Sequence, residues 1–217
     1  MSRHWLLFSV LMLPLSINAS TIFFMGDSHS VGHFGMKLDK LLRGKYDQVQ
    51  TVASCGSVAK WFFTGQKTRC GYFFKNVNGS LKHGNSAATP KLTSTLPSLK
   101  PDAIIIALGA NYTYSSDTFM KSDIKRLLDQ TEKYTKNCLW VGPPHTRKNP
   151  QRLPRLYKII EETVGERCKI FRSHEVTKYP ARGSDGIHYW GKEGKAMAYL
   201  WANKVFEEFS KTVEYPN

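Results

Sequence analysis

Short apolar segments alternate with longer amphipathic segments along most of this sequence, and this alternation restricts the possible folds more than any other feature. The apolar segments are rich in β-branched and aromatic residues, which is typical of buried strands; they cover residues 21–26, 48–53, 102–109, 138–142 and 168–171. The segments 30–44, 117–136 and 153–166 carry apolar residues three and four positions apart, which predicts helices. A last helix is expected over 192–209.

Strands that alternate with helices favour a parallel sheet covered on both faces, because each connecting helix must pack its apolar side back onto the sheet. We therefore predict an α/β fold, a three-layer α/β/α sandwich around a five-stranded parallel sheet. The length of 217 residues suits a single domain with a substantial core. Such sheets bind ligands at the carboxyl ends of their strands, so the residues that follow each strand are the first candidates for a site.

The first 19 residues have the organisation of a secretory signal peptide. Arg3 precedes an apolar run from Trp5 to Leu15, and small or polar residues follow up to Ala19. The run is shorter than the roughly 20 residues that span a membrane, which favours a cleaved signal over the alternative of a membrane anchor. We expect residues 20–217 to be exported to the periplasm or the medium without a transmembrane anchor.

All four cysteines lie in the expected mature chain, and an even number in an oxidising compartment indicates two disulfides. Of the three possible pairings we favour Cys55–Cys70, which would restrain a long loop, together with Cys138–Cys168, at the starts of two strands that could be neighbours. Buried free thiols are the alternative. No two cysteines have the CxxC spacing, which argues against a structural zinc site, and we expect no metal.

Residues 59–90 do not fit the alternation of strands and helices. They are rich in Gly, Asn, Ser and Lys and contain two aromatic clusters. A loop of this length inside a compact domain is usually functional or disordered. We interpret it as an ordered insertion that shapes the site, with a mobile surface loop as the alternative.

The formal net charge of +14 predicts attraction to polyanions. For an exported protein these would be cell-wall polymers, anionic lipid headgroups or extracellular nucleic acid. The basic residues are scattered and have no interleaved aromatic side chains, which favours a solvated basic surface, so we expect no nucleic-acid partner.

Two motifs carry the residue types needed to cleave an ester, which are a nucleophile, a base and a carboxylate that orients the base. Ser28, in GDSHS, follows the first strand and opens a helix, whose positive end would stabilise negative charge beside its hydroxyl. Asp185 and His188, in SDGIH, are three residues apart, a spacing at which a carboxylate in a turn can hold an imidazole. Taken singly, an N-cap serine and an ordinary Asp-Gly turn are the alternatives.

Two further motifs offer hydrogen-bond donors for a developing oxyanion. Gly56, in SCGSV, allows the backbone to approach a substrate closely, and Asn111, in LGANY, has an uncharged side-chain N–H. Either residue alone is a weak signal, because glycine and asparagine are common in loops.

In this order, GDSHS, SCGSV, LGANY and SDGIH resemble the four sequence blocks of the SGNH (GDSL-type) hydrolase family, and they span nearly all of the expected mature chain. The resemblance implies a flavodoxin-like fold with Ser28 as nucleophile, His188 as base and Asp185 as the residue that orients it. It also implies an oxyanion hole made of the Ser28 N–H, the Gly56 N–H and the Asn111 side chain. No metal or organic cofactor is implied.

The residues next to these motifs bear on the substrate. The family commonly has Asp after the Asn of the third block, where this chain has Tyr112, and we expect Tyr112 and Tyr114 to wall the cleft. Trp61 is expected to contact substrate as well. The GDSH form of the first block, with His29, is similar to that of bacterial cell-envelope carbohydrate esterases, including peptidoglycan O-acetylesterases; the alternative for His29 is an ordinary residue of the first helical turn.

A basic exported protein with aromatic residues near its cleft suits a polyanionic glycan, because aromatic faces stack on sugar rings and Lys and Arg attract carboxylates. We therefore predict a monomeric, exported serine esterase that removes O-acetyl groups from a cell-wall glycan through an acyl-serine intermediate. The alternatives are a lipase- or thioesterase-type acyl hydrolase, a glycan O-acetyltransferase on the same scaffold, and a glycan-binding module without catalysis.

Overall fold

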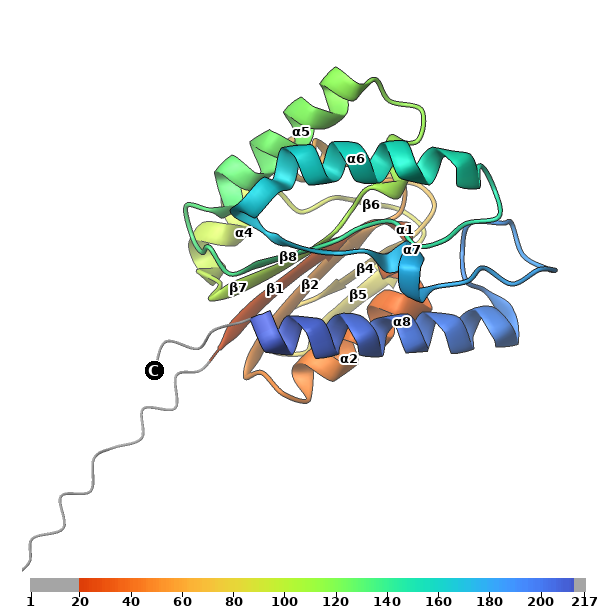
Figure 1. The fold of residues 1–217 in the computed structure, drawn as a ribbon. Helices are drawn as coiled ribbons and strands as arrows, with labels where there is room; N and C mark the ends of the chain where they lie inside the picture. The colour runs from red at the N-terminus through yellow and green to blue at the C-terminus, as the bar shows by residue number, and fades with distance from the viewer. Residues whose placement is uncertain (1–19, 213–217) are drawn as a thin grey trace, which may run out of the picture.

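The computed structural model describes residues 20–212 (Figure 1). The signal peptide expected over residues 1–19 lies outside the described residues. Within the described range, no helix has both the length and the apolar character needed to cross a membrane.

The centre of the molecule is a seven-stranded sheet with the strand order β5-β4-β2-β1-β7-β8-β9. Five of these strands are parallel: β1 (Thr21–Gly26), β2 (Gln48–Ser54), β7 (Ala103–Ala107), β8 (Cys138–Val141) and β9 (Lys169–Phe171). They are the five strands expected from the sequence. The predicted α/β fold class is therefore confirmed.

The prediction of five strands for the whole sheet is wrong, because residues 59–90 add an antiparallel hairpin to its edge. Strand β4 (Tyr72–Lys75) pairs with β2, and β5 (Leu81–Gly84) pairs with β4. Both strands are short and mostly solvent-facing, and only Phe73 is buried, so they lack the apolar run of a central strand. The rest of the insertion forms α3 (Trp61–Thr64) and a small sheet of β3 (Lys67–Thr68) and β6 (Ala87–Ala88).

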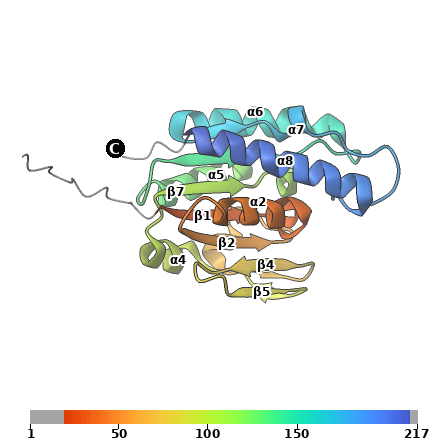
Figure 2. The ribbon, with the colours of Figure 1, turned by 90° about the horizontal axis from the view of Figure 1, so that it is seen from below.

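Helices cover both faces of the sheet, as Figures 1 and 2 show. On one face α2 (His33–Arg43) and α8 (Gly191–Thr212) pack on a cluster that includes Phe24, Ile105 and Leu139. On the other face lie α4 (Leu92–Leu99), α5 (Asp117–Thr131) and α6 (Leu153–Val164), over Met25, Ile106 and Trp140. Successive strand residues point to opposite faces, so the apolar strands fill both layers of the core.

The register of the central strands makes them end side by side. Gly26, the last residue of β1, pairs with Ala53 of β2 and with Ala107 of β7. The residues that follow these strands therefore meet at one edge of the sheet, which we call the carboxyl edge.

Two disulfides join Cys55 to Cys70 and Cys138 to Cys168, which confirms the favoured pairing. Cys55 follows β2 and lies at the carboxyl edge. Cys138 begins β8 and Cys168 directly precedes β9, so the second disulfide lies at the opposite, amino edge.

Candidate active site

Ser28 is placed by a tight connection between β1 and α1 (Ser28–Val31). The side chain of Asp27 caps this helix by accepting a hydrogen bond from the backbone N–H of His29 at 3.0 Å. A Cβ atom on Gly26 would stand 2.0 Å from the Ser30 Oγ, so the turn requires glycine at that position. The first block thus presents Ser28 at the carboxyl edge at the start of the helix.

Ser28, His188 and Asp185 form one chain of hydrogen-bonded side chains. The Ser28 Oγ lies 2.9 Å from the His188 Nε2, and the His188 Nδ1 lies 2.6 Å from the Asp185 Oδ2. A carboxylate can only accept hydrogen bonds, so the His188 Nδ1 must carry the proton that it donates to Asp185. In the neutral ring the Nε2 lone pair then faces the Ser28 hydroxyl, which is the arrangement needed to remove its proton.

Asp185 is held in its ionised form. Partial burial acts to raise the pKa of its carboxyl, but hydrogen bonds from the His188 ring and from the backbone N–H groups of His188 and Ile187 outweigh that effect and lower the pKa to about 2. The carboxylate therefore stays charged at neutral pH and fixes the orientation of the imidazole.

The loop that carries Asp185 and His188 is held from behind by residues that sequence reasoning did not identify. The Gly186 carbonyl accepts three hydrogen bonds of 2.7 to 3.0 Å, from the Thr146 hydroxyl and the backbone N–H groups of Arg147 and Lys148. The Arg147 guanidinium also donates to the carbonyls of Ala181 and Gly183. These contacts join segments far apart in the sequence, and no local pattern marks them.

The second and third blocks bring the donors of the expected oxyanion hole to the same place. Gly56 follows β2 with a φ of +81°, a backbone conformation that favours glycine. The Asn111 Nδ2 donates to the Ser57 carbonyl at 2.9 Å, which fixes the amide beside the Gly56–Ser57 backbone and leaves its second N–H free of that bond. Ser28, Gly56, Asn111 and His188 all line one cavity of about 450 Å³.

Comparison with known proteins gives matches among solved structures. No family model matches the sequence, and no curated protein matches it. The structure is similar to that of TesA, with a TM-score of 0.63 and 15% identity over 90% of this chain and 100% of the other. For Axe2, an acetylxylan esterase from Geobacillus stearothermophilus, the TM-score is 0.59 and the identity 14%, over 93% and 100% of the two chains.

A third match is a peptidoglycan O-acetylesterase, with a TM-score of 0.53 and 11% identity over 90% of this chain and 92% of the other. Identities this low establish the fold and no more. The chain has an SGNH-type fold. This confirms at the level of the fold the resemblance carried by the four sequence blocks, and it places Ser28, Gly56, Asn111 and His188 at the edge of the sheet where such a fold binds ligands.

One of the expected substrate contacts in this SGNH-type fold is wrong. Tyr112 is fully buried, and its hydroxyl donates to Asp123 at 2.7 Å and accepts from the backbone N–H of Ala59 at 2.9 Å. The turn η1 (Ala110–Tyr112) directs Asn111 into the cavity and Tyr112 into the core. Tyr112 therefore supports the loop of the third block and cannot wall the cleft.

The other three expected contacts have different positions. Tyr114 lines the cavity and is 73% exposed. Trp61 is half-buried, packs against the core and is not among the described residues that line the cavity, and its contact with substrate stays a prediction. The edge of its ring lies beside Gly56, which does line the cavity.

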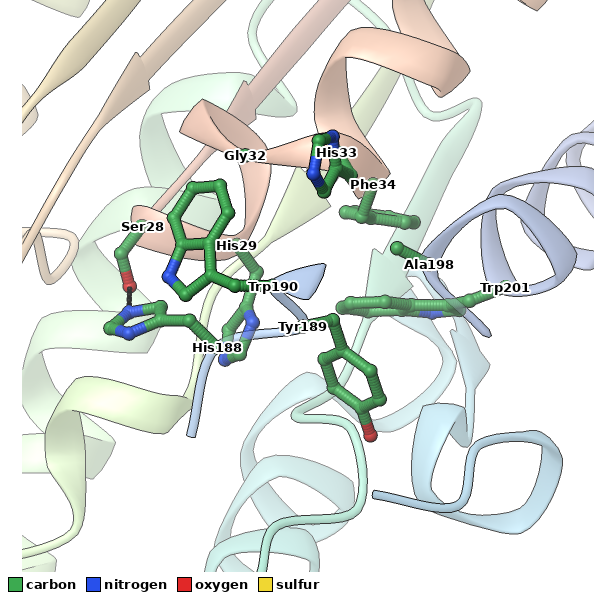
Figure 3. A pocket seen from close by; sticks show the side chains of 10 residues that line it. All are labelled: Ser28, His29, Gly32, His33, Phe34, His188, Tyr189, Trp190, Ala198 and Trp201. Atoms are coloured by element: carbon green, nitrogen blue, oxygen red, sulfur yellow. Dashed lines mark hydrogen bonds between the residues drawn. The ribbon is translucent and has the colours of Figure 1, made fainter. Parts of the chain in front are cut away.

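His29 lies against His188, and their ring centres are 5.4 Å apart (Figure 3). It lines the cavity, yet its side chain is almost entirely buried. Burial, together with the nearby His188, lowers the pKa of His29 to about 3, so the ring is neutral at physiological pH. A neutral ring at this position places no positive charge next to His188.

Trp190 is a further aromatic side chain beside the site that sequence reasoning missed. Its ring is 48% exposed and lies 6.2 Å from that of His188, and Figure 3 shows it beside Ser28 and His188. Its backbone N–H donates to the His188 carbonyl. The only available signal was its position two residues after the histidine of the fourth block.

Metal ligands do not gather in the described part of the chain: within residues 20–212, no group of three or more His, Cys, Asp or Glu side chains is arranged to hold an ion.

Proposed function

We propose that this protein is a serine esterase in which Ser28 is the nucleophile, His188 the general base and Asp185 the residue that orients the base. The observation that carries the proposal is the unbroken hydrogen-bonded chain from Ser28 to Asp185, which opens into a cavity also lined by Gly56 and Asn111. A capped turn alone would not require a histidine at 2.9 Å from the serine hydroxyl.

The reaction proceeds in two steps. As the Ser28 Oγ attacks the ester carbonyl carbon, the His188 Nε2 takes the hydroxyl proton, and the charge on the carbonyl oxygen is met by the N–H groups of Ser28, Gly56 and Asn111. The tetrahedral intermediate then expels the alcohol, which receives the proton from His188, and an acyl-Ser28 remains. A water molecule, deprotonated by His188, attacks this ester, and His188 returns the proton to the Ser28 Oγ as the acid leaves, which restores free Ser28.

The proposed substrate is the O-acetyl ester of a cell-wall glycan. Two exposed aromatic side chains, Tyr114 in the cavity lining and Trp190 beside His188, each offer a face on which a sugar ring could stack. The formal net charge of +14, the expected signal peptide and the likeness to an acetylxylan esterase and a peptidoglycan O-acetylesterase support the same substrate class and export from the cytoplasm.

A second candidate is a lipase- or thioesterase-type hydrolase for longer acyl chains. Part of the cavity lining is apolar, which would suit an alkyl chain; the apolar residues include Pro143, Pro144, Leu153, Leu156 and Ile187. A transferase on the same scaffold differs only in the group that attacks the acyl-serine, a sugar hydroxyl in place of water.

A panel of p-nitrophenyl esters of rising chain length, measured beside acetate release from O-acetylated peptidoglycan and acetylxylan, tests the proposal. We expect the highest kcat/KM with acetyl esters, release of acetate from at least one glycan, and loss of both activities in Ser28→Ala. Preference for long chains without acetate release would favour the second candidate. Acetylated acceptor in place of free acetate would identify a transferase, and hydrolysis unchanged by Ser28→Ala would reject the proposal.

A further inference from the structure

Two of the side chains that line the cavity are cations that form no ion pair with a carboxylate of the described region. Lys148 and Arg152 line the same cavity as Ser28 and His188. Within residues 20–212, no carboxylate lies within 4.0 Å of either side-chain cation, as the salt bridges of this region show. By contrast, Arg155, only three residues further on, is paired with Asp117.

Two other arginines of the described region are, like Arg155, paired with carboxylates. Arg167 is paired with Glu132 and Asp129, and Arg172 with Glu161. The acid nearest to the reactive atoms, Asp185, is already engaged by His188. Lys148 and Arg152 are not alone in this, because Arg69, Arg126, Arg147 and Arg182 of the described region also form no ion pair with a carboxylate. What sets Lys148 and Arg152 apart is that they line the cavity that holds Ser28 and His188.

Arg152 is held in a fixed position that leaves donors available. One Nη1–H donates to the Thr113 carbonyl at 2.7 Å, and the guanidinium lies 4.5 Å from the centre of the Tyr114 ring. The Tyr114 hydroxyl in turn accepts a hydrogen bond from the Asn149 side chain at 2.9 Å. A guanidinium has five N–H donors, so most of them are not used by Thr113, and a preorganised fork of this kind suits an anion.

Lys148 has two separable roles. Its backbone N–H donates to the Gly186 carbonyl and so helps to hold the loop of Asp185 and His188. Its side chain is exposed and lines the cavity. Because substitution changes only the side chain, the charge at this position can be removed while the backbone contact is kept.

We propose that Lys148 and Arg152, with the ring of Tyr114, form a subsite for an anionic group, a carboxylate or a phosphate, on the sugar whose ester is cleaved at Ser28. This inference rests on the proposed esterase function and adds to it the charge of the substrate. The cavity of about 450 Å³ joins the subsite to Ser28, and its size falls in the usual range for sites that bind small molecules.

Binding to the Ser28→Ala protein tests the subsite without turnover. Calorimetric titration with N-acetylmuramic acid, N-acetylglucosamine phosphate and neutral N-acetylglucosamine gives three Kd values under identical conditions. We expect at least one anionic sugar to bind about tenfold more tightly than the neutral one, as one charge-assisted contact would give. Which of the two does so distinguishes a carboxylate from a phosphate, and added salt should weaken this preference.

Variants of the Ser28→Ala protein assign the preference to its residues. Adding Lys148→Gln or Arg152→Gln should each reduce the ratio of neutral to anionic Kd severalfold, and adding both should bring it close to one. Arg152→Lys should retain part of the ratio. The matched control is Lys133→Gln, which removes an exposed cation that follows α5 near the amino edge and should leave the ratio unchanged.

Three results would overturn the subsite: equal affinity for the three sugars, no binding of any of them, or a preference that survives the double substitution. The proposed esterase function is measured separately, by Ser28-dependent hydrolysis of p-nitrophenyl acetate in the otherwise unchanged protein. Failure of one is thus distinguishable from failure of the other.

Discussion

The two edges of the parallel sheet are built for different purposes. At the amino edge, the backbone and side-chain groups bind one another: the Asp102 carboxylate accepts from the Thr21 N–H at 2.7 Å, and the Asp102 carbonyl accepts from Thr135 and Asn137. At the carboxyl edge, Ser28, Gly56 and Asn111 border an open cavity. Each edge has one disulfide, Cys138–Cys168 at the first and Cys55–Cys70 at the second.

This difference separates stability from activity within one fold. Changes at the amino edge should lower the free energy of unfolding and leave the chemistry intact. Changes at the carboxyl edge should affect the proposed chemistry first, because Ser28, Gly56 and Asn111 line the cavity there. Matched substitutions at the two edges test this separation.

The largest expected effect is that of Ser28→Ala. It should lower kcat for p-nitrophenyl acetate by roughly 10⁴-fold or more, because the proposed nucleophile is lost, with little change in the free energy of unfolding. The matched change at the amino edge, Asp102→Ala, should instead cost about 1 kcal/mol of stability and preserve kcat. Steady-state kinetics and urea unfolding measure both, and a large loss of kcat in Asp102→Ala would contradict the separation.

Asn111→Ala should lower kcat by about 10²- to 10³-fold, the usual loss for one oxyanion donor, with a smaller change in KM. The control is Asn137→Ala, which removes a side-chain amide that donates to the Asp102 carbonyl at the amino edge. Its kcat should equal that of the unchanged protein. Equal effects of the two substitutions on kcat would remove Asn111 from the proposed oxyanion hole.

The two disulfides should differ in what their removal changes. Replacing Cys138 and Cys168 by Ala should lower the free energy of unfolding by about 3 kcal/mol and leave kcat unchanged. Replacing Cys55 and Cys70 should cost a similar free energy and also lower kcat, because Cys55 directly precedes Gly56 and its disulfide lines the cavity. Unfolding curves and steady-state kinetics of the two double variants measure these effects. Full kcat in both variants would contradict the expected difference between the two disulfides.

A further effect, on stability, concerns Asp27, a buried acid at the carboxyl edge. Burial raises its pKa from 3.8 to about 7, so between these pH values the folded protein keeps a proton that the unfolded chain releases. The contribution of Asp27 to the free energy of unfolding therefore becomes less favourable as the pH rises between these values. Asp27→Asn stays neutral and can still accept from the His29 N–H.

Relative to the unchanged protein, Asp27→Asn should thus gain about 4 kcal/mol of stability between pH 4 and pH 8. Denaturant unfolding of both proteins at the two pH values measures this gain. The same difference in free energy at pH 4 and pH 8 would show that Asp27 titrates normally in the folded state.

The sequence predicts the parts of this molecule that depend on local patterns. The five apolar runs indicated the parallel strands, and the four motifs indicated which strand ends would meet, because parallel strands of one sheet share an edge. The β4–β5 hairpin was missed because its strands are short and largely solvent-facing, so their sequences lack the run of buried apolar residues that marks a central strand. Its position follows from pairing with β2, a contact that local sequence does not encode.

The residues around the site show the same limit. Tyr112 was assigned to the cleft from its place beside Asn111, but adjacent residues of a tight turn point in different directions, and its hydroxyl finds Asp123 in the core. The hydrogen bonds from the Arg147 guanidinium to the carbonyls of Ala181 and Gly183 join loops that are more than 30 residues apart in the sequence. Such contacts depend on how the chain packs, and the basic residues of this segment looked like an ordinary charged surface.

The most direct test of the account is to trap the acyl-enzyme. Rapid mixing with p-nitrophenyl acetate, an acid quench, and peptide mass spectrometry should find an acetyl group on Ser28 and on no other residue, in step with an initial burst of p-nitrophenol if release of the acyl group is the slower step. The Ser28→Ala protein should carry no acetyl group and show no burst. Acetylation of a different residue that accounts for turnover, or undiminished hydrolysis by Ser28→Ala, would contradict the assignment of Ser28 as the nucleophile.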